Sequence, residues 1–207
     1  HFLHHPSDPY YNGGGLFACY MDNELLFERW NAWDENDLRK GLYYHWEFGL
    51  GPNSYLNNKF MDTERLNNGA NDYPFYRYAD VLLIYAEAVG RVNNIATVDA
   101  IEKINMVHRR AYGQNPNEPS NEDFTPEDFP NLESFLDVVI LERGYETIYE
   151  GGKRWLDLLR LGRDYAKNTI MEVHGKEIAE RHFLWPIPTS EIDLNDAINE
   201  SEQNPGY

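Results

Sequence analysis

The feature that most restricts the fold of this chain is the helical periodicity of its apolar residues. From Pro74 to about residue 163, apolar side chains recur at spacings of three and four, beginning with Tyr78, Leu82 and Tyr85. Such spacing places them on one face of an amphipathic helix. Pro74 suits the first turn of that helix, because a proline there gives up no hydrogen bond. The pattern predicts a mainly α fold, with helices concentrated in residues 73–163.

The first two predicted helices form a hairpin. The first helix ends at Asn93-Asn94, and Thr97 is a suitable N-cap for a second helix that runs to Ala111. Two helices joined by so short a connection pack antiparallel. The small residues Ala88, Ala100 and Val107 also fit the offsets of a tetratricopeptide hairpin, although one hairpin alone cannot bury both of its faces.

The periodicity predicts two further helices, over residues 132–150 and 155–161. The flanking parts of the chain look different. Residues 1–72 form a loop-rich segment, and residues 1–60 hold 14 of the 30 aromatic residues. Residues 164–207 contain three prolines and no long periodic run, so we expect an extended C-terminal wrap, with a small hairpin near residues 170–181.

Composition excludes several classes of protein. The 18 Lys and Arg residues against 35 Asp and Glu give a net charge of −17, which would repel the phosphates of a nucleic acid. No apolar run approaches the roughly 20 residues of a membrane-spanning helix. The single Cys19 excludes an intramolecular disulfide and a cysteine-rich zinc module.

Three glutamates form the most prominent candidate for chemistry. Glu142, Glu146 and Glu150 are spaced by four, which places their carboxylates in one row on a helix. Such a row can hold a metal or act as an acid and base pair, but an ion-pair network is favoured because no ligand partner sits at metal spacing. The expected partners are Arg143, Arg154 and Arg160. We expect Arg154 and Asp157 to be buried and paired with the glutamates.

The remaining motifs indicate no reaction. The seven histidines form no metal-binding spacing, the Gly-rich turns lack the spacing of a phosphate loop, and no nucleophile elbow is present. We therefore expect no cofactor, no metal and no catalytic residue.

An aromatic cluster in the loop-rich segment suggests a ligand site instead. Its members are Trp30, Trp33, Tyr43, Tyr44 and Trp46, and they lie among short amide and carboxylate side chains. Flat aromatic rings stack on sugar rings while the polar groups bind hydroxyls. The alternative is that the rings fill the core, which is favoured for Trp30 because of its helical spacing from Leu26 and Phe27. For the other rings both interpretations stay open.

Several motifs together resemble one known family. They are the stretch RYADVLLIYAEA at 77–88 with Ile104-Asn105, the row Glu142-Arg143, Glu146, Glu150-Gly151 with Arg154-Trp155 and Asp157-Leu158, the stretch WPIP at 185–188, the ending QNPGY at 203–207, and NDLR at 36–39. In this order the chain resembles the C-terminal portion of the SusD/RagB-like nutrient-binding outer-membrane lipoproteins. Two departures are His108, where most members have arginine, and an extra residue at Gly152.

The resemblance implies a SusD-like C-terminal domain over residues 1–207, with the three parts described above. It implies a non-catalytic protein of the outer membrane and cell surface that captures glycans, or in some members peptides, for a SusC-like TonB-dependent transporter. The lipid anchor is expected on an N-terminal part of the protein outside this chain. No family binding residue can be matched individually to residues 1–72, which we call the aromatic segment.

Two other hypotheses remain. The chain could be a tetratricopeptide-type interaction scaffold without a small ligand. An acid-dependent glycoside hydrolase ranks third, because carboxylates in one helix row do not face each other across a cleft.

Overall fold

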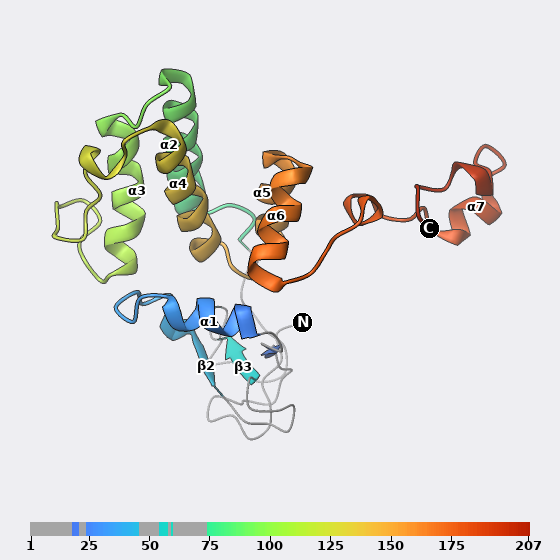
Figure 1. Cartoon of the computed structure of the whole chain (residues 1–207), viewed down its shortest axis with the longest axis horizontal. Coiled ribbons are helices and arrows are strands. Elements are labelled where there is room, and N and C mark those ends of the chain that lie inside the picture. The colour runs from blue at the N-terminus through green and yellow to red at the C-terminus, as the bar shows by residue number, and fades with distance from the viewer. Residues whose placement is uncertain (1–17, 21–23, 46–53, 58, 60–73) are drawn as a thin grey trace. The chain divides into compact units, whose positions relative to one another are not determined.

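A computed structural model describes residues 18–20, 24–45, 54–57, 59 and 74–207 of the chain (Figure 1). The chain divides into two compact units, residues 1–154 and residues 155–207, and each is described by itself. The fold is mainly helical, as the sequence predicts. Among the described residues, no helix combines the length and apolar character that crossing a membrane requires.

A helical hairpin forms the centre of the first unit. Helix α2 (Tyr78–Asn93) ends where Asn94 adopts the left-handed conformation with φ of 54°, which asparagine tolerates better than most residues. Helix α3 (Val98–Ala111) begins at Thr97, whose hydroxyl accepts a hydrogen bond from the Ala100 amide at 3.1 Å. Both boundaries agree with the sequence prediction.

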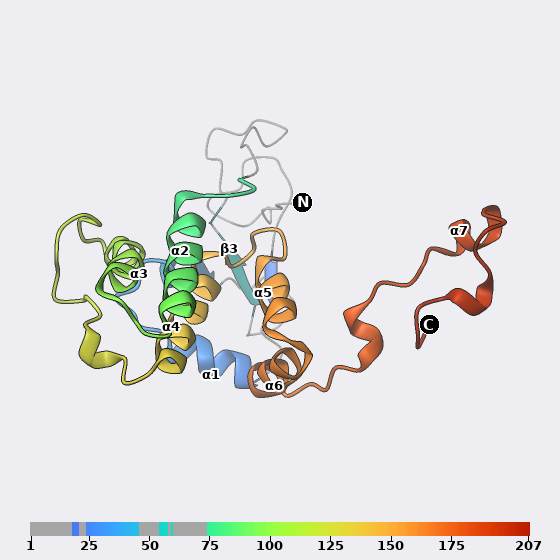
Figure 2. The ribbon, with the colours of Figure 1, turned by 90° about the horizontal axis from the view of Figure 1, so that it is seen from above.

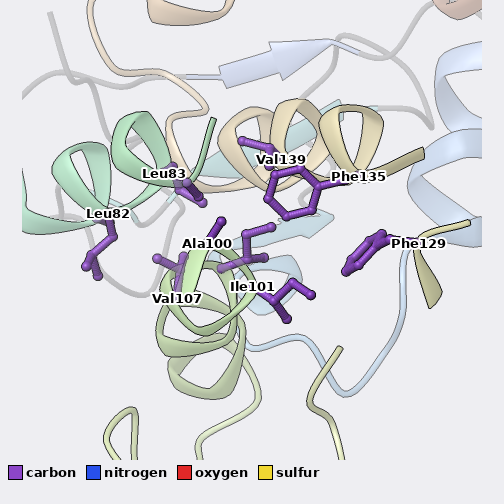
Figure 3. Close-up of a cluster of buried hydrophobic side chains, with 11 residues drawn as sticks. Leu82, Leu83, Ala100, Ile101, Val107, Phe129, Phe135 and Val139 are labelled. Atoms are coloured by element: carbon purple, nitrogen blue, oxygen red, sulfur yellow. The ribbon is translucent and has the colours of Figure 1, made fainter. Parts of the chain in front are cut away.

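Helix α4 (Leu132–Glu146) packs against α2 and α3, and the three helices lie side by side in both views (Figures 1 and 2). Apolar side chains from all three converge in one core, together with Phe129, which follows the short helix η2 (Pro126–Asp128) (Figure 3). Leu83, Ile104 and Phe135 are fully buried there. Because Gly90 of α2 has no side chain, the Phe135 ring can approach the α2 backbone closely.

The small residue that the hairpin buries on α2 differs from the one expected. Ala86 is fully buried, whereas Ala88 is exposed. Ala100 and Val107 are buried as their offsets predict. The outer side of α2 exposes an apolar stripe that includes Tyr78, Val81, Tyr85 and Val92.

The described part of the aromatic segment contains α1 (Glu24–Ala32), the short helix η1 (Lys40–Leu42) and a small sheet. Strands β1 (Ala18–Tyr20), β2 (Tyr43–His45) and β3 (Ser54–Asn57) are antiparallel in the order β1-β3-β2. The register pairs Tyr43 with Asn57. These short strands agree with the mainly α fold that the sequence predicts.

The end of α4 and the following segment correct two predictions. Helix α4 stops at Glu146 rather than at residue 150, and Tyr149 adopts a positive φ of 60° that a right-handed helix cannot contain. Helix α5 (Lys153–Leu161) then begins close to the expected position.

The second unit is more helical than predicted. Helix α6 (Arg163–His174) occupies the start of the expected extended wrap, where a small hairpin was suggested. It ends at Gly175, whose φ of 61° suits a glycine C-cap. The short helices η3 (Glu180–Phe183), α7 (Thr189–Leu194) and η4 (Glu200–Glu202) follow. Extended chain separates these elements, so an extended segment does follow residue 175.

Candidate functional site

Trp33 lies in the interior of the first unit rather than on an exposed platform. Only 7% of its surface is accessible, and its ring stacks on Tyr145 of α4 with centroids 4.4 Å apart. Its indole Nε1 donates a hydrogen bond to the Asp37 carboxylate at 2.9 Å. Tyr43, which is 4% accessible, lies between Trp33 and Tyr149, with centroids 6.2 and 5.8 Å away. These contacts hold both rings in the core, so of the two interpretations left open for them, the core interpretation holds for both.

Of the other three candidate aromatic residues, the structure describes the side chain of Trp30 only. Trp30 is half-buried at the end of α1, and the Lys40 ammonium lies 4.7 Å from the centre of its ring. Lys40 also donates to the carbonyl oxygen of Trp33 at 2.6 Å, and thereby fixes the turn after α1. The side chain of Tyr44 and all of Trp46 lie outside the described residues.

Arg39 links the aromatic segment to α4. Its guanidinium bonds the Asp37 carboxylate at 2.6 Å and the Glu142 carboxylate at 2.8 Å. Burial alone would lower the pKa of Arg39, but the hydrogen bonds to Asp37 and Glu142 outweigh burial and raise it. Asp37 therefore binds both Trp33 and Arg39, and the Trp33 ring is connected through them to Glu142.

Glu142 has a second partner in α3. His108 Nδ1 lies 3.0 Å from the Glu142 carboxylate. Burial would raise the pKa of Glu142, but His108 and Arg39 hold it below its usual range. The carboxylate is therefore ionised at neutral pH.

Glu146 and Glu150 complete the row, and Arg77 at the start of α2 joins them. Its guanidinium bonds Glu146 and Glu150, each at 2.5 Å. Glu146 also pairs with Arg110 of α3. Glu150 receives the ammonium groups of Lys59 at 2.6 Å and Lys153 at 3.0 Å. We refer to the three glutamates and their cationic partners as the α4 charge cluster.

The cationic partners of this cluster differ from the three arginines expected. Arg154 is half-buried and donates to the carbonyl oxygen of Ile140 at 3.2 Å rather than to a glutamate. Arg143 is buried beside the row, but one residue along a helix turns the side chain by about 100° away from its neighbour. Asp157 is buried and pairs with Arg160 at 2.8 Å.

Lys153 lies three residues from Glu150, but the other partners lie between 34 and 103 residues from the glutamates in sequence. Spacing along one helix therefore could not reveal them. One signal was present, because Asp37, Arg39, Arg77 and Asp80 all belong to the motifs that carry the family resemblance. Asp80 is buried, caps the start of α2 through the Arg77 amide at 2.9 Å, and binds Lys153 at 2.8 Å.

The glutamates of the α4 charge cluster are each paired with cations. A glycosidase needs one carboxylic acid with a raised pKa and a second carboxylate across a cleft. Here the pKa values of Glu142 and Glu150 are lowered, because their cationic partners outweigh burial. Within the described ranges, no group of three or more His, Cys, Asp or Glu side chains is arranged to hold a metal ion.

A helical fold of tetratricopeptide type, with an aromatic segment fastened to it by buried ion pairs, defines the class of this protein. The model of the SusD family matches residues 47–207, most of the chain. The chain belongs to the SusD family, whose members are glycan-binding proteins of the bacterial cell surface that generally have no catalytic activity.

Individual relatives extend the comparison. SusD-like protein P2 of Formosa agariphila is 32% identical over 149 residues, which cover 68% of this chain and 28% of that protein. The structure of a SusD homolog from Bacteroides thetaiotaomicron superimposes with a TM-score of 0.62 at 26% identity, over 88% of this chain and 43% of that one. Surface glycan-binding protein A from Bacteroides uniformis shares the fold at a TM-score of 0.56 and 23% identity, over 86% and 39%. The chain thus spans less than half the length of each.

Proposed function

We propose that this chain is part of a non-catalytic protein that captures glycans at the surface of the outer membrane. The observation that carries the proposal is membership of the SusD family, since the family model matches residues 47–207. The paired state of the α4 glutamates supports the non-catalytic part, because these carboxylates are not poised to transfer protons. Peptides are the second ligand class to be tested.

The proposal includes a partner and a location. A SusC-like TonB-dependent transporter would receive the captured glycan, and a lipid anchor would hold the protein to the membrane. Both follow from the family alone. They require the full-length protein to be tested.

We propose that the ligand contacts the aromatic segment through Trp30, Tyr44 and Trp46. Trp33 and Tyr43 are core residues, fixed by ring contacts with Tyr145 and Tyr149, and are not among the proposed ligand contacts. Trp30 is half-buried, and Lys40 lies over its ring, so the face of the indole that Lys40 covers is not the one that would stack on a sugar.

A glycan array probed with the full chain tests the proposal, with a peptide array beside it. The best oligosaccharide is then titrated into Trp46→Ala and Trp30→Ala. Loss of an anchoring aromatic ring should weaken binding by roughly 1–3 kcal/mol. Trp185→Ala is the matched control, because Trp185 is 86% exposed and lies in the second unit. Equal affinity of all three variants would place the site elsewhere, and an array without any bound glycan would refute the proposal.

The scaffold hypothesis has one observation in its favour, the exposed apolar stripe on the outer side of α2. A scaffold would use Val81 and Val92, which are 56% and 85% exposed, to hold a protein partner. Replacing both by serine separates the two functions. Glycan capture predicts an unchanged array, whereas a scaffold would show no glycan signal and would lose its protein partner in the variant.

A further inference from the structure

Strands β2 and β3 form an antiparallel pair. We call the end of this pair at which the chain enters β2 and leaves β3 its open end. Tyr43, the first residue of β2, pairs with Asn57, the last residue of β3. The chain therefore enters and leaves this strand pair at the same end. The stretch that joins the two strands, residues 46–53, contains Trp46 and lies outside the described residues.

One cation lies on each side of this open end, and the first binds a glutamate of α4 whereas the second binds a glutamate in the turn after it. Arg39 precedes β2 by four residues and bonds Glu142 at 2.8 Å. Lys59 follows β3 by two residues and bonds Glu150 at 2.6 Å. The two attachment points lie 20 residues apart in the chain but only eight apart along α4 and the turn after it.

Lys59 does more than neutralise a carboxylate. Its ammonium also donates to the carbonyl oxygens of Glu146 at 2.6 Å and Ile148 at 3.1 Å. These carbonyls lie where α4 ends, and the last carbonyls of a helix have no partner within it and attract cations. Burial lowers the pKa of Lys59 more than Glu150 raises it, so the amine is held in place at a desolvation cost.

Charge balance alone does not require this lysine. Glu150 already pairs with Arg77 at 2.5 Å and with Lys153 at 3.0 Å. A third cation on one carboxylate adds little to its neutralisation. Of Arg77, Lys153 and Lys59, only Lys59 follows β3 closely in the chain, so only Lys59 connects Glu150 to that strand.

We infer that Arg39 and Lys59 are positioning residues, which fasten the open end of the β2–β3 pair to α4 and to the turn after it, and so hold this strand pair in place for the ligand. The positioning of a ligand rests on the proposed function. The attachment of the strands does not rest on the proposed function, because it follows from the contacts of Arg39 and Lys59 alone.

The test replaces Lys59 with Met in the full chain, because methionine keeps the length of the side chain without its charge. Lys59→Arg should restore the attachment. Lys153→Met is the matched control, since it removes a cation from the same Glu150 without touching β3. If Lys59→Met does not fold, Lys59→Gln carries the same test, because its amide can still donate one hydrogen bond to a carbonyl.

Hydrogen exchange of backbone amides is the first readout. In Lys59→Met, amides of residues 43–45 and 54–57 should exchange roughly 10- to 100-fold faster, because charge-assisted hydrogen bonds are lost from one end of the pair. Amides of α3 should be unchanged. Unchanged exchange in the strands, or an equal increase in Lys153→Met, would overturn the inference.

Titration with cello-, malto-, xylo- and mannohexaose is the second readout. The oligosaccharide that binds the natural chain best should bind Lys59→Met roughly tenfold or more weakly, and Lys59→Arg nearly normally. Normal binding by Lys59→Met with loosened strands would refute the positioning role. Absence of binding by the natural chain to these sugars and to the glycan array would refute the proposed function, while the exchange data would still decide whether Lys59 fastens the strands.

Discussion

Replacing Arg77 with Met tests how much the α4 charge cluster contributes to stability. Arg77 holds Glu146 and Glu150 at 2.5 Å each and also donates to the Glu146 carbonyl oxygen at 2.8 Å. Removing one partner of a buried ion pair costs roughly 3–5 kcal/mol, because the remaining charge stays desolvated. Since Glu146 keeps Arg110 and Glu150 keeps two lysines, we expect the lower end, about 3 kcal/mol.

For a chain of this size, that loss lowers the melting temperature by roughly 6–12 °C. Thermal melting and urea unfolding of the variant measure it. Lys103→Met is the matched control, since Lys103 pairs with Asp99 of the same helix at 3.3 Å and the Asp99 side chain is about half exposed. Surface pairs contribute about 0–1 kcal/mol. If the two variants melt within about 2 °C of each other, the cluster does not have the strength inferred from its burial.

Two further predictions concern packing and pH. A Cβ atom on Gly90 would lie 2.7 Å from the Phe135 ring. In a urea titration, Gly90→Ala should therefore lower the free energy of unfolding by roughly 1–2 kcal/mol, even though alanine has the better helix propensity. Gly41→Ala is the control and should be close to neutral, because its Cβ would meet no atom within 4 Å. The pKa values of Glu142 and Glu150 are lowered in the folded state, so their stabilising contribution is present above the ordinary carboxyl pKa of about 4.5 and is lost as the pH falls below it. Urea midpoints should therefore be flat between about pH 7 and 5.5 and should fall below about pH 4.5, and a midpoint that rises on acidification would contradict the assignment.

The helical hairpin could be predicted from sequence because its signals are local. Thr97 caps α3 through an amide three residues away, and Asn94 ends α2 by its own backbone conformation. Apolar spacing placed Tyr78, Leu82 and Tyr85 on one face of α2, but only Leu82 is buried and the two tyrosines are exposed. The tetratricopeptide offset selected Ala88 as the small buried residue, two positions from Ala86, which is the one that is buried. A shift of two residues turns the side chain by about 200° around the helix, so a motif offset alone cannot settle this.

The site was harder to predict because its contacts are distant in sequence. Trp33 is buried by Tyr145, which lies more than 100 residues later, and Arg39 meets Glu142 over a similar separation. No pattern within a single helix contains that information. Helix α6 was missed for another reason, since its apolar spacing is weak and its clearest signals are Gly162 and Gly175 on either side.

The central claim is that the protein captures a glycan and does not cleave it. The most direct measurement incubates the full chain for a day with the oligosaccharide that binds best on the array, and then analyses the sugar by chromatography. Titration of the same sample reports binding. We predict saturable binding and recovery of the oligosaccharide at its original length. Shorter products that accumulate with time, and that disappear when Glu142 is replaced by Gln, would contradict the claim and identify a hydrolase.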